Sequence, residues 1–119
     1  MNYKHYLFLI AGLVLLPSCS NNSTDDLVGP TPASVTYNGQ IKAIIQANCI
    51  ACHSDPPQNF APMRLTTYED VKTAVLTRGL LDRISRDQGA PGMMPSGGTR
   101  LPQATINLIT QWQAEGLAE

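Results

Sequence analysis

The sequence predicts a small all-α domain that follows an export signal and a flexible tether. Two observations favour helices. Apolar residues recur at helical spacing around residues 41–45, 71–75 and 106–112, and no segment alternates in the way typical of a β-strand. The expected domain, residues 34–119, is close to the size at which a protein core alone gives marginal stability.

The first 18 residues have the features of a secretory signal, which is a charged start, a short apolar run and a small-residue cleavage site. The apolar run over residues 6–16 is too short for a comfortable transmembrane helix. Leu-Pro-Ser-Cys follows at residues 16–19 and resembles a bacterial lipobox, apart from Pro17. We therefore expect Cys19 to be lipidated, the alternative being an ordinary signal peptide with a leftover cysteine.

A lipid at Cys19 anchors a protein to a membrane surface without spanning it. We expect this protein in the cell envelope, on a membrane that faces the periplasm or the cell surface. Residues 19–33 are mostly polar and have no regular spacing of apolar residues, which predicts a flexible tether. The formal charge of −1, without a basic run or a Gly-rich phosphate loop, gives no indication of nucleic acid.

The first helix is expected over about residues 39–47, where Ile41, Ile44 and Ile45 lie on one face and Asn38 is a candidate cap. This helix would lead directly to Cys49.

A second helix is expected to begin at Thr67, with Asp70 completing a weak capping box, and to end at Gly79. Residues 80–85 could form a further helical turn. Residues 86–100 are dominated by Gly, Pro and Ser and predict a long loop, a feature that is often functional in small domains.

The last helix is expected to begin near Pro102, because proline is well suited to the first turn. Ile106, Ile109 and Trp112 would share its buried side, and Gly116 suits its C-terminal cap.

Cys49 and Cys52, separated by two residues and followed at once by His53, form the attachment pattern of a c-type haem. Each thiolate can add to one vinyl group of the haem, and the histidine is then held under the iron as an axial ligand. A large apolar haem would complete the small core, so we expect the haem-free chain to fold poorly.

Two other kinds of site also use a CxxC motif. A redox dithiol usually lies in a thioredoxin-like βαβ unit, whereas this chain is expected to be helical. A structural zinc site requires four Cys or His ligands, and only Cys49, Cys52 and His53 remain once Cys19 is acylated. Haem is the favoured cofactor, one per chain.

The sixth ligand of the iron cannot be a second histidine of the mature chain, because removal of the signal removes His5. The long loop offers Met93 and Met94. A methionine thioether is a weak neutral ligand that favours ferrous iron and raises the reduction potential. The alternative for both methionines is that they only pack on the haem.

The order of helix, CxxCH motif, helix, Met-Pro loop and Trp-containing helix over about residues 37–116 resembles a monohaem class I cytochrome c. The resemblance implies that Met94, directly before proline, is the axial ligand, with Met93 as the alternative. It also implies that the carbonyl of Pro62 accepts a hydrogen bond from His53, although Pro56 and Pro57 lie close by in sequence.

The expected function is electron transfer between redox protein partners, with no enzymatic activity and no small-molecule substrate. The alternatives are a gas or small-molecule sensor with a displaceable Met94, and a haem module that wires a larger redox complex. Tyr68 and Trp112 are expected to pack in the core. Five arginines follow the motif, of which one or two could pair with haem propionates: Arg64, Arg78, Arg83, Arg86 and Arg100.

Overall fold

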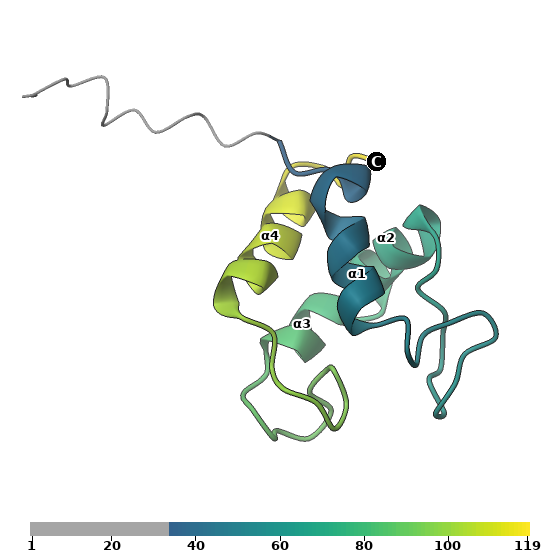
Figure 1. The fold of residues 1–119 in the computed structure, drawn as a ribbon. Coiled ribbons are helices and arrows are strands. Elements are labelled where there is room, and N and C mark those ends of the chain that lie inside the picture. The colour runs from purple at the N-terminus through teal and green to yellow at the C-terminus, as the bar shows by residue number, and fades with distance from the viewer. Residues whose placement is uncertain (1–33) are drawn as a thin grey trace, which may run out of the picture. The chain divides into compact units, whose positions relative to one another are not determined.

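The computed structural model describes residues 34–119, and the predicted signal, Cys19 and tether lie outside the described residues. Every regular element within 34–119 is a helix (Figure 1), which confirms the all-α prediction for this part of the chain. No helix in this range is long and apolar enough to cross a membrane.

The chain enters the fold through a short π-helix, η3 (Tyr37–Ile41), that continues into α1 (Lys42–Asn48). The cap is Thr36, whose hydroxyl oxygen accepts a hydrogen bond from the backbone N–H of Gly39 at 3.0 Å. The prediction of Asn38 as the cap was wrong. The helical turn begins earlier than the isoleucine spacing indicates, so Thr36 is the residue left in an extended conformation at the end.

α2 (Tyr68–Thr77) begins with the predicted capping box. The Thr67 hydroxyl accepts from the backbone N–H of Asp70 at 3.2 Å, and the Asp70 carboxylate accepts from the backbone N–H of Thr67 at 3.0 Å. The helix ends two residues before the predicted Gly79, which adopts φ +69° and links it to α3 (Leu80–Ser85). The left-handed conformation at this junction is readily available to glycine.

The long loop predicted over residues 86–100 is present, and α4 (Gln103–Ala114) follows it with Pro102 as the flanking residue. Gly116 adopts φ +95° just beyond the helix, as a C-terminal cap requires. α4 packs against η3 and α3, while α2 packs against α3.

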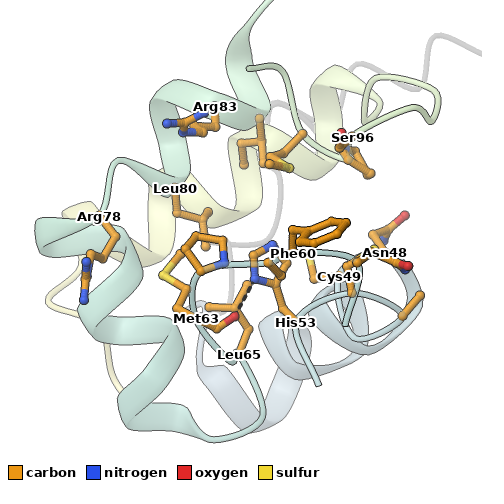
Figure 2. Close-up of a pocket in the computed structure, with 18 of the residues that line it drawn as sticks. Asn48, Cys49, His53, Phe60, Met63, Leu65, Arg78, Leu80, Arg83 and Ser96 are labelled. Atoms are coloured by element: carbon orange, nitrogen blue, oxygen red, sulfur yellow. Dashed lines mark hydrogen bonds between the residues drawn. The ribbon is translucent and has the colours of Figure 1, made fainter. Parts of the chain in front are cut away.

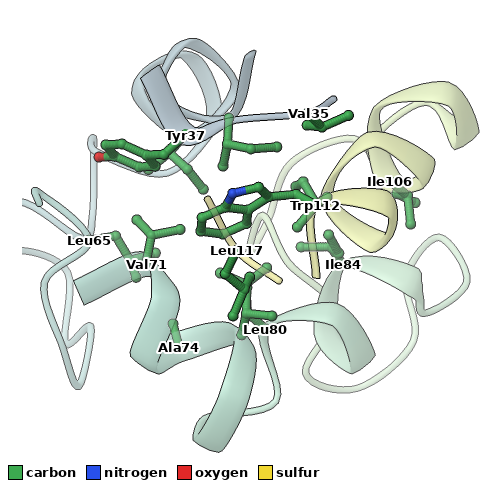
Figure 3. Packing of buried hydrophobic residues seen from close by; sticks show 14 of the residues in the cluster. Val35, Tyr37, Leu65, Val71, Ala74, Leu80, Ile84, Ile106, Trp112 and Leu117 are labelled. Carbon is green, nitrogen blue, oxygen red and sulfur yellow. The ribbon is translucent and has the colours of Figure 1, made fainter. Parts of the chain in front are cut away.

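Trp112 lies at the centre of the core and is fully buried (Figure 3). The rings of Tyr37 and Tyr68 surround it, with centroid distances of 6.1 and 6.3 Å. The Trp112 indole N–H donates to the carbonyl of Ala118 at 2.7 Å, and the Tyr68 hydroxyl donates to that of Leu117 at 2.8 Å. These two bonds hold the end of the chain against the aromatic residues. Trp112 is a core residue, as predicted, and Tyr68 is half-buried and packs against the core.

The capping box makes Asp70 a testable source of stability. Burial raises the pKa of Asp70, but hydrogen bonds led by those from Thr67 and Arg64 outweigh it and lower the pKa below 3.8. The contribution is therefore complete above pH 3.8 and is lost as the pH falls through the lower folded-state value. We expect Asp70→Ala to lower the free energy of unfolding by about 1 kcal/mol at pH 7, with a smaller difference in acid.

Urea unfolding at several pH values measures this effect. Asp87→Ala is the matched control, because Asp87 is exposed and its side chain makes no hydrogen bond within the described residues. An equal loss in the two variants would contradict a role for the capping box.

Candidate cofactor site

The CxxCH motif begins where α1 ends. The backbone N–H of Cys49 donates to the carbonyl of Ile45 at 2.8 Å and closes the helix. The Cys49 carbonyl then accepts from the N–H groups of Cys52 and His53, at 3.2 and 2.9 Å. Two hydrogen bonds to one carbonyl turn the chain tightly, and the motif residues Cys49, Cys52 and His53 consequently line one cavity.

The cavity has a volume of about 740 Å³, within the range of about 300–1,000 Å³ typical of small-molecule and cofactor sites. Figure 2 shows Cys49, His53 and Phe60 on one side and Leu80 and Arg83 of α3 across from them. Much of the remaining wall comes from residues 61–63, from Leu65 and from the long loop before α4. Most of the lining is apolar, so the cavity suits a large apolar ligand.

His53 is buried, and its ring is oriented by a hydrogen bond to the backbone. Its Nδ1 lies 2.7 Å from the carbonyl oxygen of Met63, the dashed bond in Figure 2. Because a carbonyl can only accept, Nδ1 carries a proton, and in the neutral ring Nε2 then keeps a lone pair available for a metal.

The prediction that the Pro62 carbonyl accepts this bond was wrong by one residue. The backbone N–H of Leu65 donates to the carbonyl of His53 at 2.9 Å and sets how the two segments are aligned. With this alignment the carbonyl of Met63, not that of Pro62, lies at the His53 ring. Pro62 lines the cavity instead.

Cys49 and Cys52 are free, partly buried thiols. Burial raises the pKa of Cys49 to about 11, whereas reactive redox cysteines have a lowered pKa that favours the thiolate. Among residues 34–119, no three His, Cys, Asp and Glu side chains are grouped so as to hold a metal ion.

The two methionines of the long loop are placed differently. Met94 lines the cavity, and its backbone N–H donates to the carbonyl of Arg83 at 3.1 Å. Met93 is buried outside the cavity lining, with its N–H bonded to the carbonyl of Ala90. The structure thus brings Met94 to the same cavity as the motif, while the identity of the ligand stays a prediction.

Of the five arginines, Arg78 and Arg83 line the cavity. The guanidinium of Arg78 makes no hydrogen bond or ion pair within residues 34–119, and that of Arg83 donates to the carbonyl of Gly92 at 3.3 Å. The other three are engaged in contacts outside the cavity lining: Arg64, Arg86 and Arg100.

Sequence reasoning missed Phe60, Leu80 and Leu101 as lining residues. Phe60 has φ +61° and a fully exposed side chain at the cavity, an unusual state for a large aromatic residue. Its position as the one aromatic residue between the motif and α2 was the available signal. Leu80 and Leu101 carry no such signal, because buried leucines are expected in any helical core.

Comparisons with protein-family models, curated proteins and solved structures found no match to the chain.

The apolar wall can be tested with two leucines on neighbouring helices. Leu80 is 7% exposed at the cavity and Leu76 is 55% exposed on α2. We expect Leu80→Ala to lower the free energy of unfolding by about 2 kcal/mol and Leu76→Ala by less than about 0.5 kcal/mol. Thermal unfolding of both variants checks this, and similar melting temperatures would contradict the assignment of Leu80 to the wall.

Proposed function

We propose that this protein is an exported electron carrier that holds one haem covalently through Cys49 and Cys52. In this proposal His53 and Met94 are the axial ligands of the iron. The observation that carries it is the convergence of two thiols, an imidazole and a thioether on one apolar cavity, from segments far apart in the chain. Haem supplies reversible one-electron chemistry when bound.

The donor set fits a haem. The Nδ1–H of His53 is used by the Met63 carbonyl at 2.7 Å, which leaves Nε2 as the ligand atom and increases its basicity. The thioether of Met94 is a soft, neutral donor that favours ferrous iron. Leu80 and Ile84, which line the cavity from α3, would exclude water from the haem.

The same geometry favours a carrier over an enzyme. His53 is the one histidine within residues 34–119, and its ring N–H is already engaged by a carbonyl. If Met94 occupies the remaining axial position, no open site is left for a substrate. The redox dithiol is disfavoured, because burial raises the pKa of Cys49 to about 11.

The first test is an absorption spectrum of the protein produced with haem-attachment machinery. We expect a low-spin c-type spectrum with the weak far-red band of a methionine bound to ferric iron. Covalent haem without that band would favour a ligand sensor. A spectrum without any haem would overturn the proposal and would favour a redox dithiol or a metal site at the motif.

Two adjacent methionines provide a matched pair for the ligand. We expect Met94→Ala to abolish the far-red band and to lower the reduction potential by on the order of 100 mV, since axial ligands tune haem over about 0.8 V. Met93→Ala should keep the band, because Met93 does not line the cavity. Redox titration and spectra of both variants measure this; equal effects would defeat the assignment.

A lipid on Cys19, which lies outside the described residues, is the proposed membrane anchor. We expect Cys19→Ala to release most of the protein from the membrane fraction with its haem content unchanged, because the lipid and haem cysteines are different residues. Cell fractionation with haem staining measures both quantities. Retention of the variant in the membrane fraction would exclude lipid at Cys19 as the anchor.

A further inference from the structure

The loop that carries Met94 has little backbone support of its own. Its interior hydrogen bonds are short-range turns, such as Met93 N–H to Ala90 and Gly98 N–H to Pro95. Among the described residues, one main-chain bond joins the interior of this loop to the rest of the fold, from Met94 N–H to the carbonyl of Arg83. Something else has to hold the loop beside the cavity.

Arg86, at the C-terminal end of α3, reaches the loop from outside the cavity. Its Nη1 donates to the carbonyl of Pro91 at 2.6 Å, and its Nη2 donates to the Asp82 carboxylate at 2.6 Å. Asp82 lies one helical turn earlier, so the ion pair orients the guanidinium from within α3. The planar fork lets a single side chain join a helix carboxylate to a loop carbonyl.

Arg83 contacts the loop residue that follows Pro91: its Nη1 donates to the carbonyl of Gly92 at 3.3 Å. Gly92 has φ +74°, and a Cβ there would lie 2.6 Å from Nη1 of Arg86 and 2.7 Å from Nη1 of Arg83. Both guanidinium groups therefore lie against the backbone just before Met94, at a position where a side chain would displace them.

The two ends of the loop are also tied together. The Nε of Arg100 donates to the carbonyl of Arg86 at 3.0 Å, and its backbone N–H donates to the side-chain oxygen of Gln88 at 2.6 Å. The Gln88 amide then donates to the carbonyl of Gly98 at 3.1 Å. With its ends held, the loop positions Met94 through the contacts that Arg86 and Arg83 make in its middle.

We propose that Arg86, oriented by Asp82, is a positioning residue that holds Met94 at the cavity and so strengthens its bond to the haem iron. The inference rests on the proposed function, in which Met94 is the axial ligand. Arg86 acts through the Pro91 carbonyl, three residues before Met94, and does not line the cavity. Its removal should allow the loop to move and an added ligand to compete better for the iron.

The experiment uses the haem-loaded protein and titrates ferric wild type, Arg86→Ala and Arg86→Lys with imidazole at neutral pH. We expect Arg86→Ala to bind imidazole about threefold to tenfold more tightly, with a weaker far-red band, because partly exposed charge-assisted bonds contribute modestly. Arg86→Lys should be intermediate, since an ammonium group lacks the planar fork that reaches both partners.

Two matched pairs separate positioning from general stability. Asp82→Ala should shift imidazole affinity in the same direction as Arg86→Ala, whereas Asp87→Ala should not, because the Asp87 side chain makes no ion pair within residues 34–119. Gly92→Ala should also increase imidazole affinity more than Gly89→Ala does. Both glycines have positive φ, but a Cβ at Gly89 meets nothing within 4 Å.

The results separate a failure of the positioning role of Arg86 from a failure of the proposed methionine ligation. Equal imidazole affinity in wild type and Met94→Ala would overturn methionine ligation and, with it, this inference. A clear difference there, with wild-type affinity in Arg86→Ala and Asp82→Ala, would overturn the inference alone. A lower melting temperature in Arg86→Ala with unchanged affinity and band would also overturn it. If Arg86→Ala does not fold, the Asp82 and glycine pairs decide.

Discussion

The hydrogen bond between Nδ1 of His53 and the carbonyl of Met63, 2.7 Å long, organises the candidate site. It joins the motif to the segment that returns toward α2, and the bond from Leu65 N–H to the His53 carbonyl supports the same alignment. It also determines which imidazole nitrogen is protonated, so that Nε2 is left to act as a ligand. The bond therefore fixes the orientation of the His53 ring at the cavity.

The two sides of the site are built by different means. The motif side is held by local geometry, because α1 ends at Cys49 and one carbonyl accepts the next two N–H bonds. The methionine side is held by side chains, chiefly those of Arg83 in α3 and of Arg86 directly after it, which contact an irregular loop. If the proposed haem is bound, His53 would be a rigidly held ligand, whereas the bond to Met94 would depend on the contacts that hold the loop, and such contacts are one way to tune a reduction potential.

The core beneath the site is small and depends on aromatic packing. Trp112 and Tyr37 lie in the buried core (Figure 3), and the half-buried Tyr68 packs against them. The Trp112 indole and the Tyr68 phenol donate hydrogen bonds to carbonyls of the last residues of the chain. Within residues 34–119 every buried side-chain nitrogen and oxygen atom has a hydrogen-bond partner, as stability requires. The cavity occupies the space between this core and the two loops, so a large apolar cofactor would add the packing that the protein atoms do not supply there.

Features that depend on neighbouring residues were predictable from the sequence: the helices and the Thr67–Asp70 capping box. Features that depend on how distant segments align were not. The histidine's partner proved to be Met63 rather than Pro62, because a long-range bond to Leu65 sets that alignment. Sequence alone also left Met93 and Met94 chemically equal. Only the tertiary structure distinguishes them: Met94 bonds to the Arg83 carbonyl of α3 and lines the cavity, whereas Met93 is buried outside its lining, and local spacing does not encode this difference.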